Sequence, residues 1–235
     1  MPKILNSIDY SLKELLVDSM NEAAGLYKDF KSQVPFNETH NCFPSARWDA
    51  INEILSRAFQ KHNIPFASTK RGFWELLLFC DSNRQVLLSA MREDRFNDIC
   101  SNPEEKAPRY FDSLVSLNSE LEAINSQCSL INNQYEACDK YNQLENLCRC
   151  LPSPKSSKYH HVILLFDVEY DEITSIRLCV INNKFEIVDE EDILQLVLSK
   201  RAESIKVDKV SENKEQNDIV QRGFVKLKKN AIDAV

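Results

Sequence analysis

Two apolar stretches of this 235-residue chain decide its fold: Trp74-Glu75-Leu76-Leu77-Leu78-Phe79 and His161-Val162-Ile163-Leu164-Leu165-Phe166. Each is bounded by turn-forming residues, as expected of a β-strand. The first is apolar almost throughout, so we expect both of its faces to be covered by other elements. The chain therefore contains enough apolar strand sequence to form a sizeable buried core.

Further strands are predicted around each stretch. The first set comprises residues 66–69, 73–80 and 86–91, separated by the turn clusters 70–72 and 81–84, and the second comprises 161–168, 174–181 and 184–188. Short connections between consecutive strands favour antiparallel pairing. The sequence thus predicts an α+β fold with an antiparallel sheet built from two three-stranded meanders.

Helices are predicted from the spacing of apolar residues. Residues 9–31 form the first, and a second begins with Ser45 as N-cap and ends near Asn63. The acidic run 189–192 is typical of a helix N-terminus and leads into 193–198. We expect one domain over residues 1–200 and a polar, weakly basic, flexible tail over 201–235.

A long helix or helical hairpin is predicted between about 107 and 150. Its apolar side chains alternate at three and four residues, which is typical of a coiled-coil seam: Leu114, Leu117, Leu121, Ile124, Cys128, Ile131, Tyr135 and Cys138. One unbroken helix would be roughly 65 Å long. The segment either folds back near Asn132 or projects and pairs with a second copy as a homodimer.

The scarcity of glycine excludes several kinds of site. The chain has three glycines, where an average composition gives about sixteen. Phosphate-binding loops and the nucleophile elbow of hydrolases need glycines close together, and no two of these three are close. We expect no nucleotide cofactor, and no other cofactor is indicated.

Charge and cysteine usage indicate a compartment. The formal net charge is −7, which argues against a general nucleic-acid or membrane-surface binder. The chain shows no signal peptide and no apolar run of transmembrane length. We expect a cytoplasmic protein with no membrane partner, whose eight cysteines are reduced thiols. Nucleic acid is expected only at the basic stretch 222–229, if anywhere.

Carboxylates gather in residues 160–199, which contain nine acidic and two basic side chains. Asp167, Glu169 and Asp171 share one face of an ideal strand, so they could hold Mg²⁺ or Mn²⁺ for phosphodiester hydrolysis, with Asp81 and Glu93 contributing if the strand sets share a sheet. The acidic face could instead mimic DNA. The competing interpretation is a solvated hairpin end opposite Arg177.

A second candidate site lies at the strand ends of the first set. Aromatic and charged groups there offer contacts to a ligand or partner, and they belong to Arg71, Trp74, Glu75, Arg92, Glu93 and Arg95. The alternative is a buried tryptophan with Glu–Arg pairs that stabilise the hairpin. We include Arg71, Trp74 and Arg92, together with the seam residues of 107–150, among the predicted interaction residues.

Three runs carry a family resemblance: Lys70-Arg71-Gly72-Phe73-Trp74-Glu75-Leu76, Met91-Arg92-Glu93-Asp94-Arg95-Phe96 and His161-Val162-Ile163-Leu164-Leu165-Phe166-Asp167-Val168. They resemble an uncharacterised family of cytosolic proteins from low-GC Gram-positive bacteria and their phages, over about residues 45–195. The resemblance implies a bacterial or phage setting and no particular activity.

The leading hypothesis from the sequence is a non-enzymatic interaction or regulatory protein. It would self-associate or capture a partner through the long helix. The alternatives are a metal-dependent nuclease that uses the clustered carboxylates, and an acidic nucleic-acid mimic that inhibits a nucleic-acid-binding protein.

Overall fold

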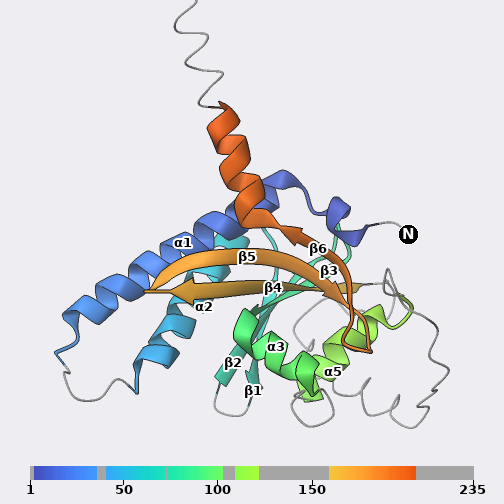
Figure 1. The fold of residues 1–235 in the computed structure, drawn as a ribbon, viewed down its shortest axis with the longest axis horizontal. Helices are drawn as coiled ribbons and strands as arrows, with labels where there is room; N and C mark the ends of the chain where they lie inside the picture. Colours follow the sequence, from blue (N-terminus) through green and yellow to red (C-terminus); the bar gives the residue numbers. More distant parts are fainter. Residues whose placement is uncertain (1–2, 36–40, 72–73, 103–108, 122–158, 205–235) are drawn as a thin grey trace, which may run out of the picture. The chain divides into compact units, whose positions relative to one another are not determined.

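The computed structural model describes residues 3–35, 41–71, 74–102, 109–121 and 159–204. The chain divides into two compact units, Met1–Leu194 and Gln195–Val235. Of the second unit the structure describes residues 195–204, which are helical. The first unit contains a six-stranded sheet with helices on both faces (Figure 1). The mixed α+β class is therefore confirmed.

The six strands lie in the sheet in their chain order. They are β1 (Phe66–Arg71), β2 (Trp74–Asp81), β3 (Val86–Arg92), β4 (His160–Glu169), β5 (Glu172–Ile181) and β6 (Ile187–Asp192). All neighbours are antiparallel except β3 and β4, which are parallel. A sheet that is antiparallel throughout is thus the wrong prediction. The chain leaves β3 and enters helices before β4, and such a crossover connection permits parallel pairing.

The two faces of the sheet are covered by different helices. On one face lie α1 (Tyr10–Gln33) and α2 (Phe43–Lys61), where the Phe59 ring stacks on Phe79 with centroids 4.1 Å apart. On the other lie α3 (Glu93–Ser101) and α5 (Arg109–Val115), whose Leu114 packs with Leu76 and Leu78. Because side chains alternate along a strand, β2 supplies apolar residues to both faces, as the sequence indicates.

Helix α2 begins earlier than predicted. Its N-cap is Cys42, and Pro44 lies within the first turn, so Ser45 is not the cap. Proline suits the first turn because its fixed φ is helical and its missing N–H would have no partner there. For α1, the carboxylate of Asp9 caps the helix by accepting the Leu12 N–H at 3.0 Å.

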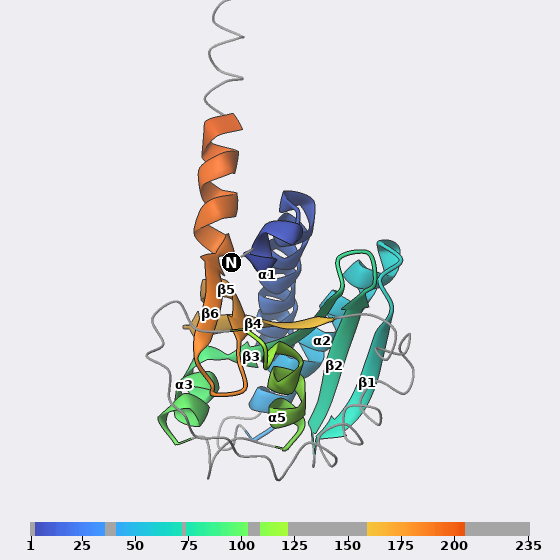
Figure 2. The same cartoon turned by 90° about the vertical axis from the view of Figure 1, so that its right-hand side faces the viewer.

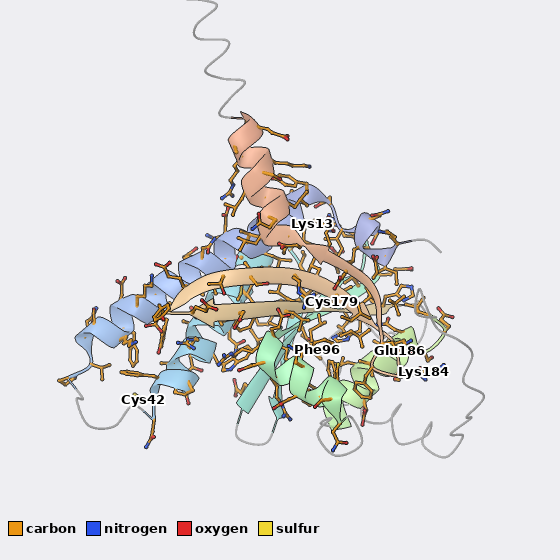
Figure 3. The ribbon with its side chains drawn as sticks, in the orientation of Figure 1. Lys13, Cys42, Phe96, Cys179, Lys184 and Glu186 are labelled. Atoms are coloured by element: carbon orange, nitrogen blue, oxygen red, sulfur yellow. The ribbon has the colours of Figure 1, made fainter. Side chains whose placement is uncertain are left out.

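The acidic run 189–192 lies in β6, which corrects its assignment to a helix, while the helix predicted at 193–198 is present directly after it and extends through residue 204. Contacts with the start of the chain explain why the acidic run is a strand. The Asp189 carboxylate accepts the Leu5 N–H at 3.0 Å, and Glu191 pairs at 2.7 Å with Lys13, a buried lysine on α1 (Figure 3). These partners are about 180 residues away in the chain, so local helix signals do not decide the structure here.

The segment 107–150 does not begin as one long helix. Helix α5 ends at Val115, and the 3₁₀ turn η2 (Ser116–Asn118) follows it. Asn118 is fully buried and tied to the sheet, which stops the helix from continuing in the same direction. The rest of the segment from residue 122 lies outside the described residues. The single long helix is therefore not confirmed, and α3, which has no counterpart in the prediction, precedes it.

Candidate functional site

Strands β2 and β3 pair over only three residues and then separate. Their ladder joins Asp81 to Val86, Cys80 to Leu87 and Phe79 to Leu88, and it ends there. Beyond that point β2 stays paired with β1 and β3 stays paired with β4. Figure 2 shows β1 and β2 running in a different direction from β3 and β4. The sheet is therefore split along part of its length.

Helix α2 covers this split and leaves a cleft, which we call the β2–β3 cleft. Its volume is ≈ 240 Å³, and its walls are largely apolar. The lining residues come from α2, β2 and β3: Pro44, Trp48, Asn52 and Leu55; Glu75, Leu76, Leu77 and Phe79; and Ala90. An apolar hollow with a few polar groups is the usual form of a small-ligand site. The polar side chains here are Asn52 and Glu75.

Backbone groups also face the split. The Cys80 N–H bonds to the Pro65 carbonyl on the β1 side at 2.9 Å. Because successive residues of a strand direct their N–H and C=O groups to opposite edges, Glu75 and Leu77 direct theirs toward β3. By the same alternation, Ala90 and Arg92 on β3 direct theirs toward β2. The β2–β3 ladder does not reach any of these four residues.

Two charged side chains lie at the open end of the split. Glu75 is exposed, and its carboxylate has a weak contact of 3.4 Å with the Ser68 hydroxyl. Arg92 ends β3 on the same face as Ala90, and its Nη2 lies 2.9 Å from the Asp94 carboxylate. The Arg92 Nε is buried and has no hydrogen-bond partner among the residues that the structure describes. The cleft therefore has an anionic and a cationic group near one end.

The predicted interaction residues at the strand ends border this opening. Arg71 and Trp74 pair with each other at the far end of the β1–β2 ladder, next to Glu75, and Arg92 ends β3. The side chains of Arg71 and Trp74 lie outside the described part of the structure. Trp48, Asn52 and Ala90 were missed by the sequence reasoning. A polar residue four positions after Trp48, on the side of α2 that faces the sheet, was the available signal.

The three predicted metal-binding carboxylates do not all lie on one strand face, because Asp171 lies beyond the end of β4. The register shift beside Asp167 and Val168 adds a residue to β5, so β4 keeps its alternation, and Asp167 accepts the N–H of Val168 at 2.8 Å. Glu169 ends the strand, and Asp171 lies in the following turn at a φ of 64°. No group of three or more potential metal ligands gathers among the described residues.

Asp81 and Glu93 are also far apart. They lie at opposite ends of β3, which at seven residues is roughly 20 Å long. The Asp81 carboxylate accepts the backbone N–H groups of Asn83 and Arg84 at 3.0 and 3.1 Å and pairs with the Arg84 side chain. Glu93 pairs with Arg177, which also contacts Glu190 at 2.9 Å. These carboxylates have local structural partners and do not converge.

The Asp171 turn fastens the β4–β5 hairpin to both helices of its face. Its carboxylate contacts Lys31 of α1 at 2.6 Å and Arg47 of α2 at 2.8 Å. The hydrogen bond from Lys31 is the main cause that lowers the pKa of Asp171 below its usual value. The preceding Tyr170 is 97% exposed at a φ of 50°. Asp171 thus belongs to a structural clamp.

A second, polar hollow of ≈ 460 Å³ lies where α1 begins and α2 ends, around the β2–β3 turn. Arg84 pairs there with both Asp9 and Asp81. The Tyr159 hydroxyl donates to the Ser82 hydroxyl at 3.0 Å. Its main charged groups already satisfy one another, so the geometry favours the β2–β3 cleft as the candidate site.

The structure describes only the first residues of the predicted coiled-coil seam. Leu114 is fully buried in the core of its own chain, and Leu117 packs partly buried against the same cluster. Leu121 is half-buried, and its carbonyl accepts the Asn182 amide at 3.4 Å. Ile124, Ile131 and Tyr135 lie outside the described residues. The beginning of the seam therefore packs within the first unit.

Comparison with known proteins gives one family match. A model described as a family of unknown function, DUF5986, matches residues 5–234. No curated protein matches the chain. Within the described residues, no helix has both the length and the apolar character needed to cross a membrane.

Proposed function

The chain belongs to this family of unknown function, and from its own residues we propose a role for it. We propose that it is an interaction protein, which binds its ligand or partner in the β2–β3 cleft. The separation of β2 from β3 beyond Phe79 and Leu88 carries the proposal. A continuous sheet would pair these strands along their length. The split instead leaves backbone donors and acceptors of both strands beside an apolar hollow.

The physical cost of this arrangement supports a binding role. Backbone N–H and C=O groups that lack a partner in a partly buried site are costly, so folded proteins pair nearly all of them. A bound molecule would supply these partners and cover the apolar surface of Trp48 and Leu77. Apolar contact would give affinity, and Asn52 and Glu75 would orient the ligand.

The binding of small probes tests this proposal. We expect 2-phenylethylamine and 3-methylbutylamine, which combine an apolar body with an ammonium group, to bind saturably at millimolar concentration. In ¹H–¹⁵N NMR spectra the largest shifts should fall on the amides of Leu77 and Ala90. Ala90→Leu should weaken binding at least about tenfold, because filling the hollow removes the buried contact area.

Two further variants serve as controls. Ala202→Leu adds the same side chain at an exposed position and should bind the probes like the wild type. Asn52→Leu narrows the cleft from the helix side, so it gives the same test if Ala90→Leu disturbs β3. Shifts that map to another part of the molecule, or that persist in both cleft variants, would contradict the proposal, as would the absence of binding.

Self-association through 107–150 stays a separate proposal. It rests on the apolar spacing of the seam residues that follow Leu121. The burial of Leu114 in its own core leaves Ile124, Ile131 and Tyr135 as the positions through which such an interface would form.

A further inference from the structure

We infer that the occupant of the β2–β3 cleft is an extended polypeptide segment of a partner protein, which pairs with the edge of β2 that the described strands leave open beyond Phe79. This inference rests on the proposed function and specifies the chemistry of its ligand. It follows from three features of the cleft: the spacing of the backbone groups, the direction of the strands and the order of side chains along β2.

The backbone groups have the spacing of a strand ladder. Glu75 and Leu77 are two residues apart, so their N–H and C=O groups recur about every 6.8 Å along the edge of β2. An extended polypeptide presents complementary groups at the same interval, and a compact small molecule does not. Addition of a strand to an open sheet edge is a common mode of peptide recognition.

The direction of the incoming strand follows from the existing ladder. At Phe79 and Leu88, β3 is the antiparallel partner of β2. A segment that continues this pairing toward Glu75 takes over the place that β3 leaves when it separates. It runs antiparallel to β2, so it meets Leu77 first and Glu75 two residues later.

The side chains of β2 then define the partner sequence. Leu77 and Glu75 face α2 together with Phe79, so the residues opposite them also face α2. Opposite Leu77, near Trp48, the cleft favours an apolar side chain. Opposite Glu75, which forms no ion pair with the side chains that the structure describes, it favours lysine or arginine. The partner segment therefore reads apolar, any residue, basic.

A set of blocked pentapeptides tests this pattern by NMR titration. Acetyl-Ser-Leu-Thr-Lys-Ser-amide should bind and shift the amides of Glu75 and Leu77. Methylation of the leucine nitrogen removes the N–H that pairs with β2, so binding should weaken at least about tenfold. Replacement of the lysine by glutamate should weaken it about threefold to tenfold.

A charge reversal in the protein provides the matched control. Glu75→Lys should invert the preference between the lysine and glutamate peptides, and Glu75→Gln should abolish it. Equal binding of the N-methylated peptide would overturn the inference, because backbone pairing would then have no role. If the two amine probes bind but no peptide does, the cleft is a site for small ligands and the inference of an extended polypeptide segment is refuted. If neither binds, the proposed function fails as well.

Discussion

Replacement of Asn118 by alanine is expected to lower the free energy of unfolding by about 3 to 5 kcal/mol, because it leaves three buried backbone groups without partners. The Asn118 amide nitrogen donates to the carbonyls of His161 and Ile181, each at 2.8 Å, and its oxygen accepts the His161 N–H at 3.1 Å. The residue is fully buried. Urea denaturation monitored by circular dichroism measures the loss.

Ser116 on the same 3₁₀ turn supplies the control. Its hydroxyl donates to the Ser113 carbonyl at 2.7 Å, a local bond within the helical segment. Ser116→Ala should lower the free energy of unfolding by less than about 1 kcal/mol. If the Asn118→Ala and Ser116→Ala proteins proved equally stable, the bridge from η2 to β4 and β5 would not be a main support of this fold.

Acidification is expected to destabilise the protein through His161. Complete burial lowers the pKa of its ring to about 3, from an ordinary value of 6.5, so the ring is neutral in the folded state. The unfolded chain takes up the proton below pH 6.5, so stability is lost as the pH falls from about 6.5 toward 3. The loss should reach about 2 kcal/mol at pH 5.

A neutral side chain at this position should remove that part of the acid sensitivity. The His161 Nε2 lies 2.9 Å from the Ser89 hydroxyl, and glutamine can keep a hydrogen bond there. Between pH 7 and pH 5, we expect the free energy of unfolding of His161→Gln, and also of His161→Phe, to fall by about 2 kcal/mol less than that of the wild type. His62→Gln, at the exposed end of α2, is the control. An unchanged pH dependence in both His161 variants would refute the assignment.

The strands and the first two helices could be predicted from the sequence because local pattern decides them. Leu76 and Leu78 pack on the α5 side while Phe79 packs on Phe59 of α2, and a continuous apolar run predicts this two-sided burial. The bounds of α1 follow from the same periodicity. At these positions local preference and tertiary packing agree.

The failures have a common physical cause, which is partners distant in the chain. Asp189 and Glu191 resemble a helix start, but Leu5 and Lys13 hold them in a strand. Leu114 continues the spacing of a coiled-coil seam, although the sheet of its own chain buries it. A spacing pattern shows that a side chain is buried and does not show against which surface.

The candidate site could be predicted only in part for a related reason. The charged and aromatic residues at the ends of β2 and β3 indicated a place for a ligand. The split between these strands depends on pairing: β2 follows β1 along its length, while β3 follows β4. No local signal in either strand records where two neighbours part, so the cleft and its helix-side wall at Trp48 and Asn52 had to come from the structure.

Hydrogen exchange along β2 tests directly whether β2 and β3 are open to a partner beyond Phe79. In the free protein, NMR should show the amides of Glu75 and Leu77 exchanging at least about tenfold faster than those of Leu76 and Leu78, which bond to β1. Addition of acetyl-Ser-Leu-Thr-Lys-Ser-amide should slow the exchange of Glu75 and Leu77 selectively. Equal protection of all four amides in the free protein would show that the ladder continues and that no open edge exists.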